Sequence, residues 1–143
     1  MPVYEIPYTE YEIPASAAFP KRHSVLRPVL STRIIHGKKA ISCLAIVDSG
    51  ADNCAFPRSF MDALSLEASI APREGTIGVA DARVETYFCS VTLDFGVIQI
   101  PVFAGFTSGL EQSGVGLLGQ AGFFDTFNIT FRKSIGVFQL ELP

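Results

Sequence analysis

The residues of this chain that are best placed for chemistry are a carboxylate and the small residues that follow it. An apolar run over 44–47 leads directly into Asp48-Ser49-Gly50, so a strand would deliver the Asp48 carboxylate to a turn. A carboxylate held at a fixed point can act as a general acid or base. Asp-Ser-Gly is also a common turn sequence, because Asp and Ser bond their own backbone and Gly tolerates positive φ. The tripeptide alone is therefore compatible with a plain turn.

A second element, at residues 116–119, favours a site over a plain turn. Two leucines lie between glycines in Gly116-Leu117-Leu118-Gly119, and the aromatic residues Phe123 and Phe124 follow. Together with Asp48–Asn53, and in this order, the element resembles the signatures of retropepsin-like aspartic proteases, the single-domain relatives of retroviral proteases. The resemblance covers residues 25–142. It implies a mostly β fold, a closed acid-protease barrel with one or two short helices.

The resemblance implies a hydrolase that uses two carboxylates. Carboxylates held about 3 Å apart cannot both ionise, so they share a proton, and one acts as base on a water molecule while the other acts as acid. Asp48 is followed by Ser-Gly, whereas Asp81, Asp94 and Asp125 are not. Two chains must therefore contribute one Asp48 each across a two-fold axis. We expect an aspartic endopeptidase that acts as a C2 homodimer on peptides or proteins.

The resemblance also implies roles for neighbouring residues. Ser49 and Gly50 would brace the active-site loop, with the Ser49 hydroxyl bonding across the axis and Gly50 allowing a substrate strand to approach. A hairpin over 76–84 would form a flap that closes over the substrate and excludes water. Substrate binding would involve three residues of the loop and three of the flap, namely Ala51, Asp52, Asn53, Gly78, Val79 and Ala80.

Two positions depart from the family pattern. Asp81 lies in the flap where a small residue is expected, which affects the flap's register and the substrate preference. Gln120 stands where retroviral members commonly carry an Arg that ties the following helix to the acidic loop. We therefore expect the loop to be braced by other residues.

The elements that must position these residues are short strands separated by turns. Pro57 begins a short helix predicted over 57–64, and a second short helix is predicted over 122–127. Period-two alternation and β-branched residues predict strands over 29–35, 40–47, 76–79, 83–93, 97–103, 128–131 and 135–142. Many short strands with two brief helices are typical of a mostly β barrel.

The N-terminal segment differs in composition from the rest of the chain. Residues 1–24 hold four of the nine prolines and three of the four tyrosines, and Tyr-Glu-Ile-Pro occurs at 4–7 and again at 11–14. Proline disfavours the inner strands of a sheet. We expect an arm over 1–24 and the protease domain over 25–143. The arm is either a loosely attached tail or a strap that packs on the body or on a second subunit.

Composition limits the partners and the compartment. The chain has 143 residues, 11 basic and 14 acidic side chains and a net charge of -3. It lacks an extended basic cluster, so nucleic acid is not an expected partner. Three cysteines without Cys-x-x-Cys or Cys/His spacing predict neither disulfides nor zinc. With no signal peptide and no apolar run of about 18 residues, we expect a cytoplasmic protein that needs no membrane, metal or cofactor.

Competing interpretations concern the same segments. Residues 114–119 fit Gly-x-Gly-x-x-Gly, but only 24 residues follow Gly119, too few for a dinucleotide-binding βαβ unit. Asp48, Asp52 and Asn53 do not have the spacing of an EF-hand loop. Cys54 has no assigned basic partner, so we expect a small buried thiol. The remaining alternative to the enzyme is a retropepsin-like dimer that binds peptides or assembles without cleaving them.

Overall fold

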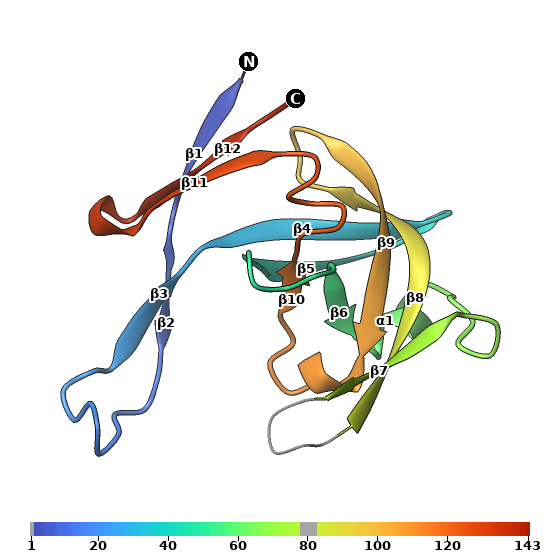
Figure 1. The fold of residues 1–143 in the computed structure, drawn as a ribbon, viewed down its shortest axis with the longest axis horizontal. Coiled ribbons are helices and arrows are strands. Elements are labelled where there is room, and N and C mark those ends of the chain that lie inside the picture. Colours follow the sequence, from blue (N-terminus) through green and yellow to red (C-terminus); the bar gives the residue numbers. More distant parts are fainter. Residues whose placement is uncertain (1, 78–82) are drawn as a thin grey trace. The chain divides into compact units, whose positions relative to one another are not determined.

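The computed structural model describes residues 2–77 and 83–143 (Figure 1). These residues form mostly β-strands, with one short α-helix, α1 (Phe60–Ala63), and two 3-10 helices, η2 (Ser108–Leu110) and η3 (Lys133–Ile135). Across the two described ranges, every helix is too short or too polar to cross a lipid bilayer. The chain divides into two compact units, one formed by Met1–Val29 with Thr126–Pro143 and the other by Leu30–Asp125. The predicted mostly β class is confirmed.

The larger unit is built on a seven-stranded sheet. Its strands, in the order in which they pair, are β4 (Val29–His36), β5 (Lys39–Val47), β10 (Gly116–Leu118), β6 (Ala55–Pro57), β9 (Gln99–Thr107), β8 (Arg83–Asp94) and β7 (Arg73–Ile77). In addition, β4 pairs with β8 through Arg33–Asp94, Ile34–Leu93 and Ile35–Thr92. The first strand of the order is thus joined to the sixth. Closure into a barrel and the two-fold dimer stay predictions.

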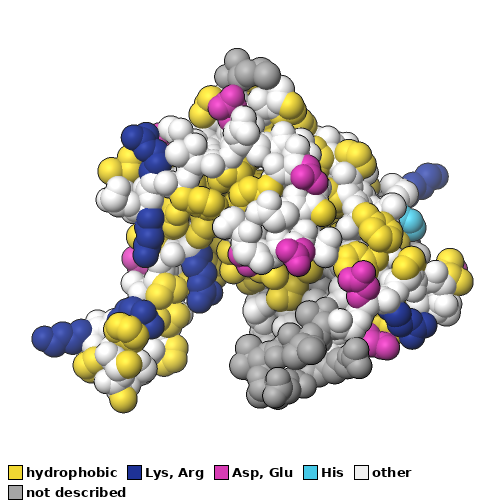
Figure 2. Space-filling model, viewed as in Figure 1, with side chains coloured by type: hydrophobic (Ala, Val, Ile, Leu, Met, Phe, Trp, Pro, Cys, Tyr) yellow, Lys and Arg dark blue, Asp and Glu magenta, His cyan; other side chains and the backbone are white. Residues whose placement is uncertain are grey.

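Alternating side chains make β9 a strand with one buried face. Ile100, Val102, Ala104 and Phe106 are buried, whereas Pro101 and Phe103 are exposed. Successive side chains of a strand point to opposite faces, so this period of two directs one set into the core. Each large apolar side chain that is fully buried contributes about 1.5–3 kcal/mol. Other apolar side chains remain on the surface (Figure 2).

Of the two predicted helices, only the first forms an α-helix. α1 buries Met61, and Leu64 directly after it is fully buried, so the apolar side of the predicted segment faces the core. The second prediction was wrong, because residues 122–126 form turns. Gly122 has a φ of +97°, outside the helical range. The turn is closed instead by the Asp125 carboxylate, which accepts a hydrogen bond from Gly122 N at 3.2 Å.

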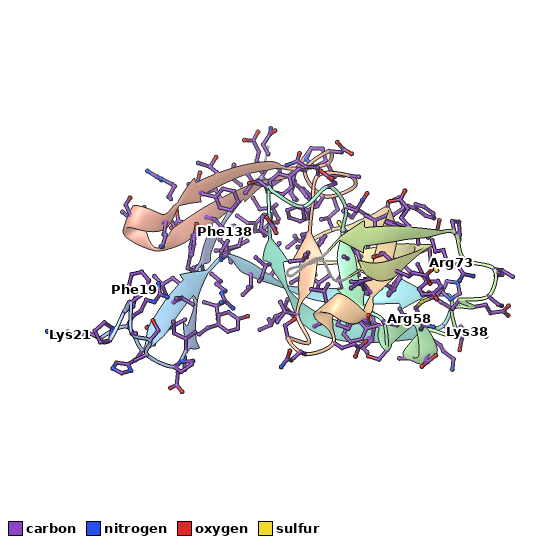
Figure 3. All side chains as sticks on the ribbon, turned by 60° about the horizontal axis from the view of Figure 1, so that its bottom comes forward. Phe19, Lys21, Lys38, Arg58, Arg73 and Phe138 are labelled. Carbon is purple, nitrogen blue, oxygen red and sulfur yellow. The ribbon has the colours of Figure 1, made fainter. Side chains whose placement is uncertain are left out.

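The smaller unit contains most of the N-terminal arm. Strand β1 (Val3–Pro7) lies at the edge of a three-stranded antiparallel sheet, next to β12 (Val137–Glu141), which pairs in turn with β11 (Asn128–Arg132). The ring of Tyr8 packs edge-on against Phe138, with ring centroids 5.8 Å apart. Phe138 is labelled in this sheet in Figure 3. The edge position of β1 agrees with the proline content of the arm.

The rest of the arm forms a separate two-stranded sheet. Strand β2 (Thr9–Glu12) pairs antiparallel with β3 (Ser24–Arg27), from Thr9–Arg27 to Glu12–Ser24. Cations stack on the aromatic rings of this segment, with Arg27 5.2 Å from the ring centroid of Tyr11. Two stretches of the arm, Val3–Pro7 and Thr9–Glu12, are therefore paired as strands. The boundary at residue 24 between arm and protease domain stays a prediction.

Candidate active site

The loop that carries Asp48 connects two strands that are not neighbours in the sheet. β5 ends at Val47 and β6 begins at Ala55, and β10 lies between them. β10 runs parallel to β5, with Leu118 opposite Val47, and pairs with β6 where Leu117 faces Ala55. The chain must therefore pass over the carboxyl end of β10 on its way from β5 to β6. The two motifs singled out in the sequence meet at this point.

Backbone hydrogen bonds tie the loop to β10 and to the segment after it. Leu118 O accepts from Asp48 N at 3.0 Å, Ala51 O accepts from Gln120 N at 2.8 Å, and Asp52 O accepts from Ala121 N at 2.9 Å. Asn53 also forms an isolated parallel bridge with Ala121. Because the bonds are spread along the loop, its backbone is held over most of its length.

The close approach of the two segments explains the glycines of the second motif. A Cβ at position 119 would lie 2.6 Å from the carbonyl oxygen of Ala51 and closer still to that of Asn53. At position 116 it would lie 2.6 Å from a ring carbon of Phe56. Real Cβ atoms do not approach other atoms so closely. Gly116 and Gly119 are therefore needed for packing.

The Asp48 side chain forms the turn that its sequence predicts. Its Oδ1 accepts a hydrogen bond from Gly50 N at 2.9 Å, and its carbonyl accepts one from Ala51 N at 3.2 Å. These bonds hold the carboxylate against its own loop. Asp48 is half-buried, and Ser49 and Gly50 are exposed. The carboxylate is thus oriented and still accessible.

Gln120 braces the loop with its side chain as well as its backbone. Its Nε2 donates a hydrogen bond of 2.7 Å to Ser49 O. The expectation that other residues would take over from the family's Arg was therefore wrong at this position. A Gln amide offers two N–H donors, so the residue type itself carried a signal that the sequence interpretation overlooked.

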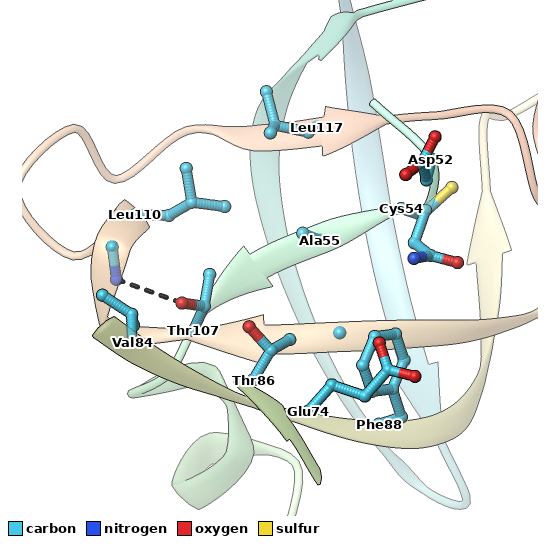
Figure 4. A pocket seen from close by; sticks show the side chains of 13 residues that line it. Asp52, Cys54, Ala55, Glu74, Val84, Thr86, Phe88, Thr107, Leu110 and Leu117 are labelled. Atoms are coloured by element: carbon cyan, nitrogen blue, oxygen red, sulfur yellow. Dashed lines mark hydrogen bonds between the residues drawn. The ribbon is translucent and has the colours of Figure 1, made fainter. Parts of the chain in front are cut away.

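A cavity of about 370 Å³ lies beside the loop (Figure 4). Of the residues predicted to bind substrate, Asp52 and Asn53 line this cavity. Asp48 and Ala51 are not among the lining residues, and Ala51 instead contributes its carbonyl to the bond from Gln120. Gly78, Val79 and Ala80 lie outside the described residues. The wall opposite the loop comes from β7, β8, β9 and η2 and includes Glu74, Thr86, Phe88, Thr107 and Leu110.

Sequence reasoning missed the part of the wall that β8 supplies. The alternation over 83–93 predicts one buried face along the whole strand. In the structure Thr86 and Phe88 are buried on one face, whereas Val91 and Leu93 are buried on the other. The buried side changes along the strand, since one end lines the cavity and the other end packs in the core. The change is marked by Thr86, a polar residue that the structure buries on the side of the strand that lines the cavity.

The hairpin predicted as a flap is present as a pair of strands. β7 and β8 run antiparallel, from Arg73–Tyr87 to Ile77–Arg83. The residues that connect them, including Asp81, lie outside the described residues. Closure of this hairpin over a substrate stays a prediction.

Cys54, at the end of the loop, is a buried thiol. It is fully buried, and its Sγ donates a weak hydrogen bond to Ala121 O at 3.7 Å. Burial raises the pKa of the thiol above the ordinary 9.0. A thiol that stays protonated at neutral pH is a poor nucleophile, which favours carboxylate chemistry at this site.

Comparisons with known proteins identify the fold. No protein-family model matches this sequence, and no curated protein matches it. Among solved structures, the chain is similar to a crystal structure of a retropepsin-like aspartic protease from Rickettsia conorii, with a TM-score of 0.61 and 13% sequence identity. The match covers 92% of this chain and 98% of that chain. This likeness shows that the chain has a fold similar to that of a retropepsin-like protein.

Proposed function

We propose that this chain is an aspartic endopeptidase that cleaves peptide bonds as a two-fold homodimer. One observation carries the proposal: Asp48 is held, oriented and accessible, on a loop that β10 ties down between β5 and β6. The fold in which this occurs is similar to that of an aspartic protease. The proposal includes a closed barrel in each subunit, which the additional pairing between β4 and β8 supports.

The two-fold dimer follows from the number of carboxylates that the reaction needs. The chain contains one Asp-Ser-Gly, at Asp48, and a second carboxylate at the same centre must come from another copy. A C2 axis brings each Asp48 against its own equivalent. Ser49 is exposed next to Asp48, where its hydroxyl can bond across the axis and brace the two loops.

The reaction proceeds by attack of water without a covalent intermediate. One Asp48 carboxylate takes a proton from water as the oxygen bonds to the peptide carbonyl carbon. The other carboxyl group protonates the carbonyl oxygen. As the C–N bond breaks, the first carboxyl group gives its proton to the leaving amine, and the second takes a proton back from a hydroxyl group of the intermediate. Such a proton shared between carboxylates is an established property of aspartic protease pairs. Activity is highest on the acidic side of neutral, where the pair holds one proton.

The neighbouring residues bind and enclose the peptide. Gly50 lets a substrate strand approach the loop backbone, while Ala51, Asp52 and Asn53 bind it along one side. The hairpin tip with Gly78, Val79 and Ala80 closes over the other side and excludes water. The cavity beside Asp52 then accepts one substrate side chain.

The experiment that tests this function compares the wild type with Asp48→Asn on a mixed peptide library. We expect the wild type to cleave peptides and to be inhibited by a statine-type transition-state mimic. Asp48→Asn loses hydrolysis but keeps its dimer by sedimentation, because the amide preserves the shape and removes the base. Asp62→Asn, an exposed position in α1, serves as the matched control and keeps full activity.

Two results would contradict the proposal. One is cleavage by Asp48→Asn at the parental rate, which would remove Asp48 from the chemistry. The other is a wild type that binds the library peptides as a dimer and leaves them intact, which would show the non-catalytic peptide-binding module.

A further inference from the structure

We propose that the cavity beside the Asp48 loop selects peptides that present a Lys or Arg side chain, through the carboxylates of Asp52 and Glu74. This inference rests on the proposed function, since the cavity is taken as a subsite of the peptidase. Asp52 lies on the loop, and Glu74 lies on β7 in the opposite wall. Both line the same cavity of about 370 Å³.

The lining of the cavity combines two carboxylates with apolar side chains. In Figure 4 the side chain of Asp52 lies on the loop and that of Glu74 lies beside Phe88 in the opposite wall, whereas Leu110 and Val84 lie farther along the cavity. Glu74 is paired with Thr86 across β7 and β8, so it shares a face with the β8 residues that line the wall. A ligand side chain that matches this lining is apolar along its stem and polar at its tip.

Neither carboxylate is neutralised within the described part of the chain. Across residues 2–77 and 83–143, the side chains of Asp52 and Glu74 have neither a hydrogen bond nor an ion pair. None of the described residues that line the cavity is a Lys, Arg or His. Two carboxylates therefore line a space to which the described residues contribute no cation.

Two basic side chains near the hairpin, those of Arg58 and Arg73, are engaged elsewhere. Arg58 and Arg73 stack over the ring of Tyr87, with their guanidinium carbons 4.9 and 5.2 Å from its centroid. Both are labelled on the same side of the larger unit in Figure 3. Arg73 also forms an ion pair with Glu85 at 3.7 Å. Glu85 and Tyr87 alternate with the residues that line the cavity, so these cations belong to the other face of the hairpin.

Lys and Arg have the shape and charge that this cavity fits. Each has an apolar stem that packs on hydrophobic surface and a cationic head that needs a partner. The stem lies along the apolar lining, and the cationic head is attracted by the two carboxylates. An acidic side chain in the same position is repelled by both, so the cavity discriminates by charge as well as by size.

The test uses pairs of peptides that are identical except for Lys or norleucine at each position around the scissile bond. Norleucine keeps the stem and lacks the charge. We expect kcat/KM to be about tenfold higher for Lys at one position, because two partly solvated ion pairs contribute modestly. Glu74→Gln lowers the preference about threefold, and Glu74→Lys reverses it in favour of a Glu peptide. The preference shrinks as salt rises.

Glu85→Gln is the matched control. It removes one negative charge from the same hairpin on the face away from the cavity, so the preference for Lys stays at the wild-type value. Equal kcat/KM for Lys and norleucine at every position, with hydrolysis intact, would overturn this inference and leave the proposed function standing.

If the protein does not hydrolyse peptides, a binding measurement still tests the charge preference of the cavity separately from the proposed peptidase function. Calorimetry with statine-type peptides that carry Lys or norleucine reports the charge preference without any cleavage. Tighter binding of the Lys peptide that is lost in Glu74→Gln supports the cavity assignment even for an inactive protein. Equal binding of both peptides overturns it.

Discussion

The side-chain amide of Gln120 donates a hydrogen bond to the carbonyl oxygen of Ser49, 71 residues earlier in the chain, at 2.7 Å. The same residue donates from its backbone N to Ala51 O at 2.8 Å. Two donors of one residue thus hold the loop on both sides of Gly50. The loop that carries the Asp48 carboxylate is therefore held by the residue that directly follows the second motif.

Gln120→Ala removes the side-chain bond and keeps the backbone bond. We expect the free energy of unfolding to fall by about 1 kcal/mol, since the bond is exposed to solvent. If the loop positions the catalytic pair, kcat falls more than KM rises, because the misplaced carboxylate affects the transition state. Urea unfolding and peptide kinetics measure the two effects. Gln112→Ala, at an exposed position, is the control. Equal kcat and KM for the two variants would contradict a role of the Gln120 side chain in positioning the Asp48 loop.

Gly119→Ala introduces a methyl group where the loop backbone lies closest to β10. The added Cβ would collide with the carbonyl oxygens of Ala51 and Asn53, and backbone atoms cannot rotate away. We expect a loss of about 2–3 kcal/mol in the free energy of unfolding. Gly109→Ala, where the Cβ would meet Thr107 Oγ1 at an ordinary 3.5 Å, costs much less. Equal urea midpoints for the two variants would argue against the tight approach.

Tyr8→Ala tests whether the arm stabilises the fold of its own chain. Its ring packs edge-on against the buried Phe138, so its removal costs about 1–2 kcal/mol. Tyr4→Ala, in which the lost side chain is 39% exposed, has a smaller effect. Thermal unfolding compares the two variants.

Removal of residues 1–20 tests the arm's role in association. It takes away β1 and leaves β12 with one unpaired edge, so we expect lower stability and a greater tendency to aggregate. Sedimentation of the shortened chain measures association directly. A dimer that survives this removal would restrict the arm to supporting its own chain.

Cys43 gives a prediction about pH. Burial raises the pKa of its thiol from 9.0 to about 11, and the hydrogen bond with the Gly116 backbone offsets this only in part. Below pH 9 the thiol is protonated in both the folded and the unfolded chain. Between pH 9 and about 11 it ionises in the unfolded chain first, so its contribution to stability is lost as the pH rises toward 11.

Alkylation measures this difference. With iodoacetamide at pH 8, we expect Cys43 in the folded protein to react much more slowly than a cysteine in an unstructured peptide, because only the thiolate attacks. The alkylation rate of Cys43 increases with pH up to about pH 11. Mass spectrometry resolves the three cysteines. A Cys43 rate equal to that of the peptide at pH 8 would contradict the burial of the thiol.

Local features of the site were open to prediction from the sequence. Asp48-Ser49-Gly50 forms the expected turn because Asp and Gly act on their own backbone, within three residues. The strands around it follow from period-two alternation, which reflects one buried face. The resemblance to a family rested on two motifs far apart in the sequence, and the pairing of β5 with β10 places them side by side.

Contacts between distant residues were decided only by the tertiary structure. Gln120 braces Ser49, Glu74 faces the cavity opposite Asp52, and β1 pairs with β12. The helix predicted over 122–127 became a turn because Gly122 adopts a left-handed φ. By itself the sequence determined which carboxylate and which turn could form a site, since residue types and short-range spacing encode them. The fold determined which side chains surround that site, since only packing brings residues far apart in the chain within bonding distance.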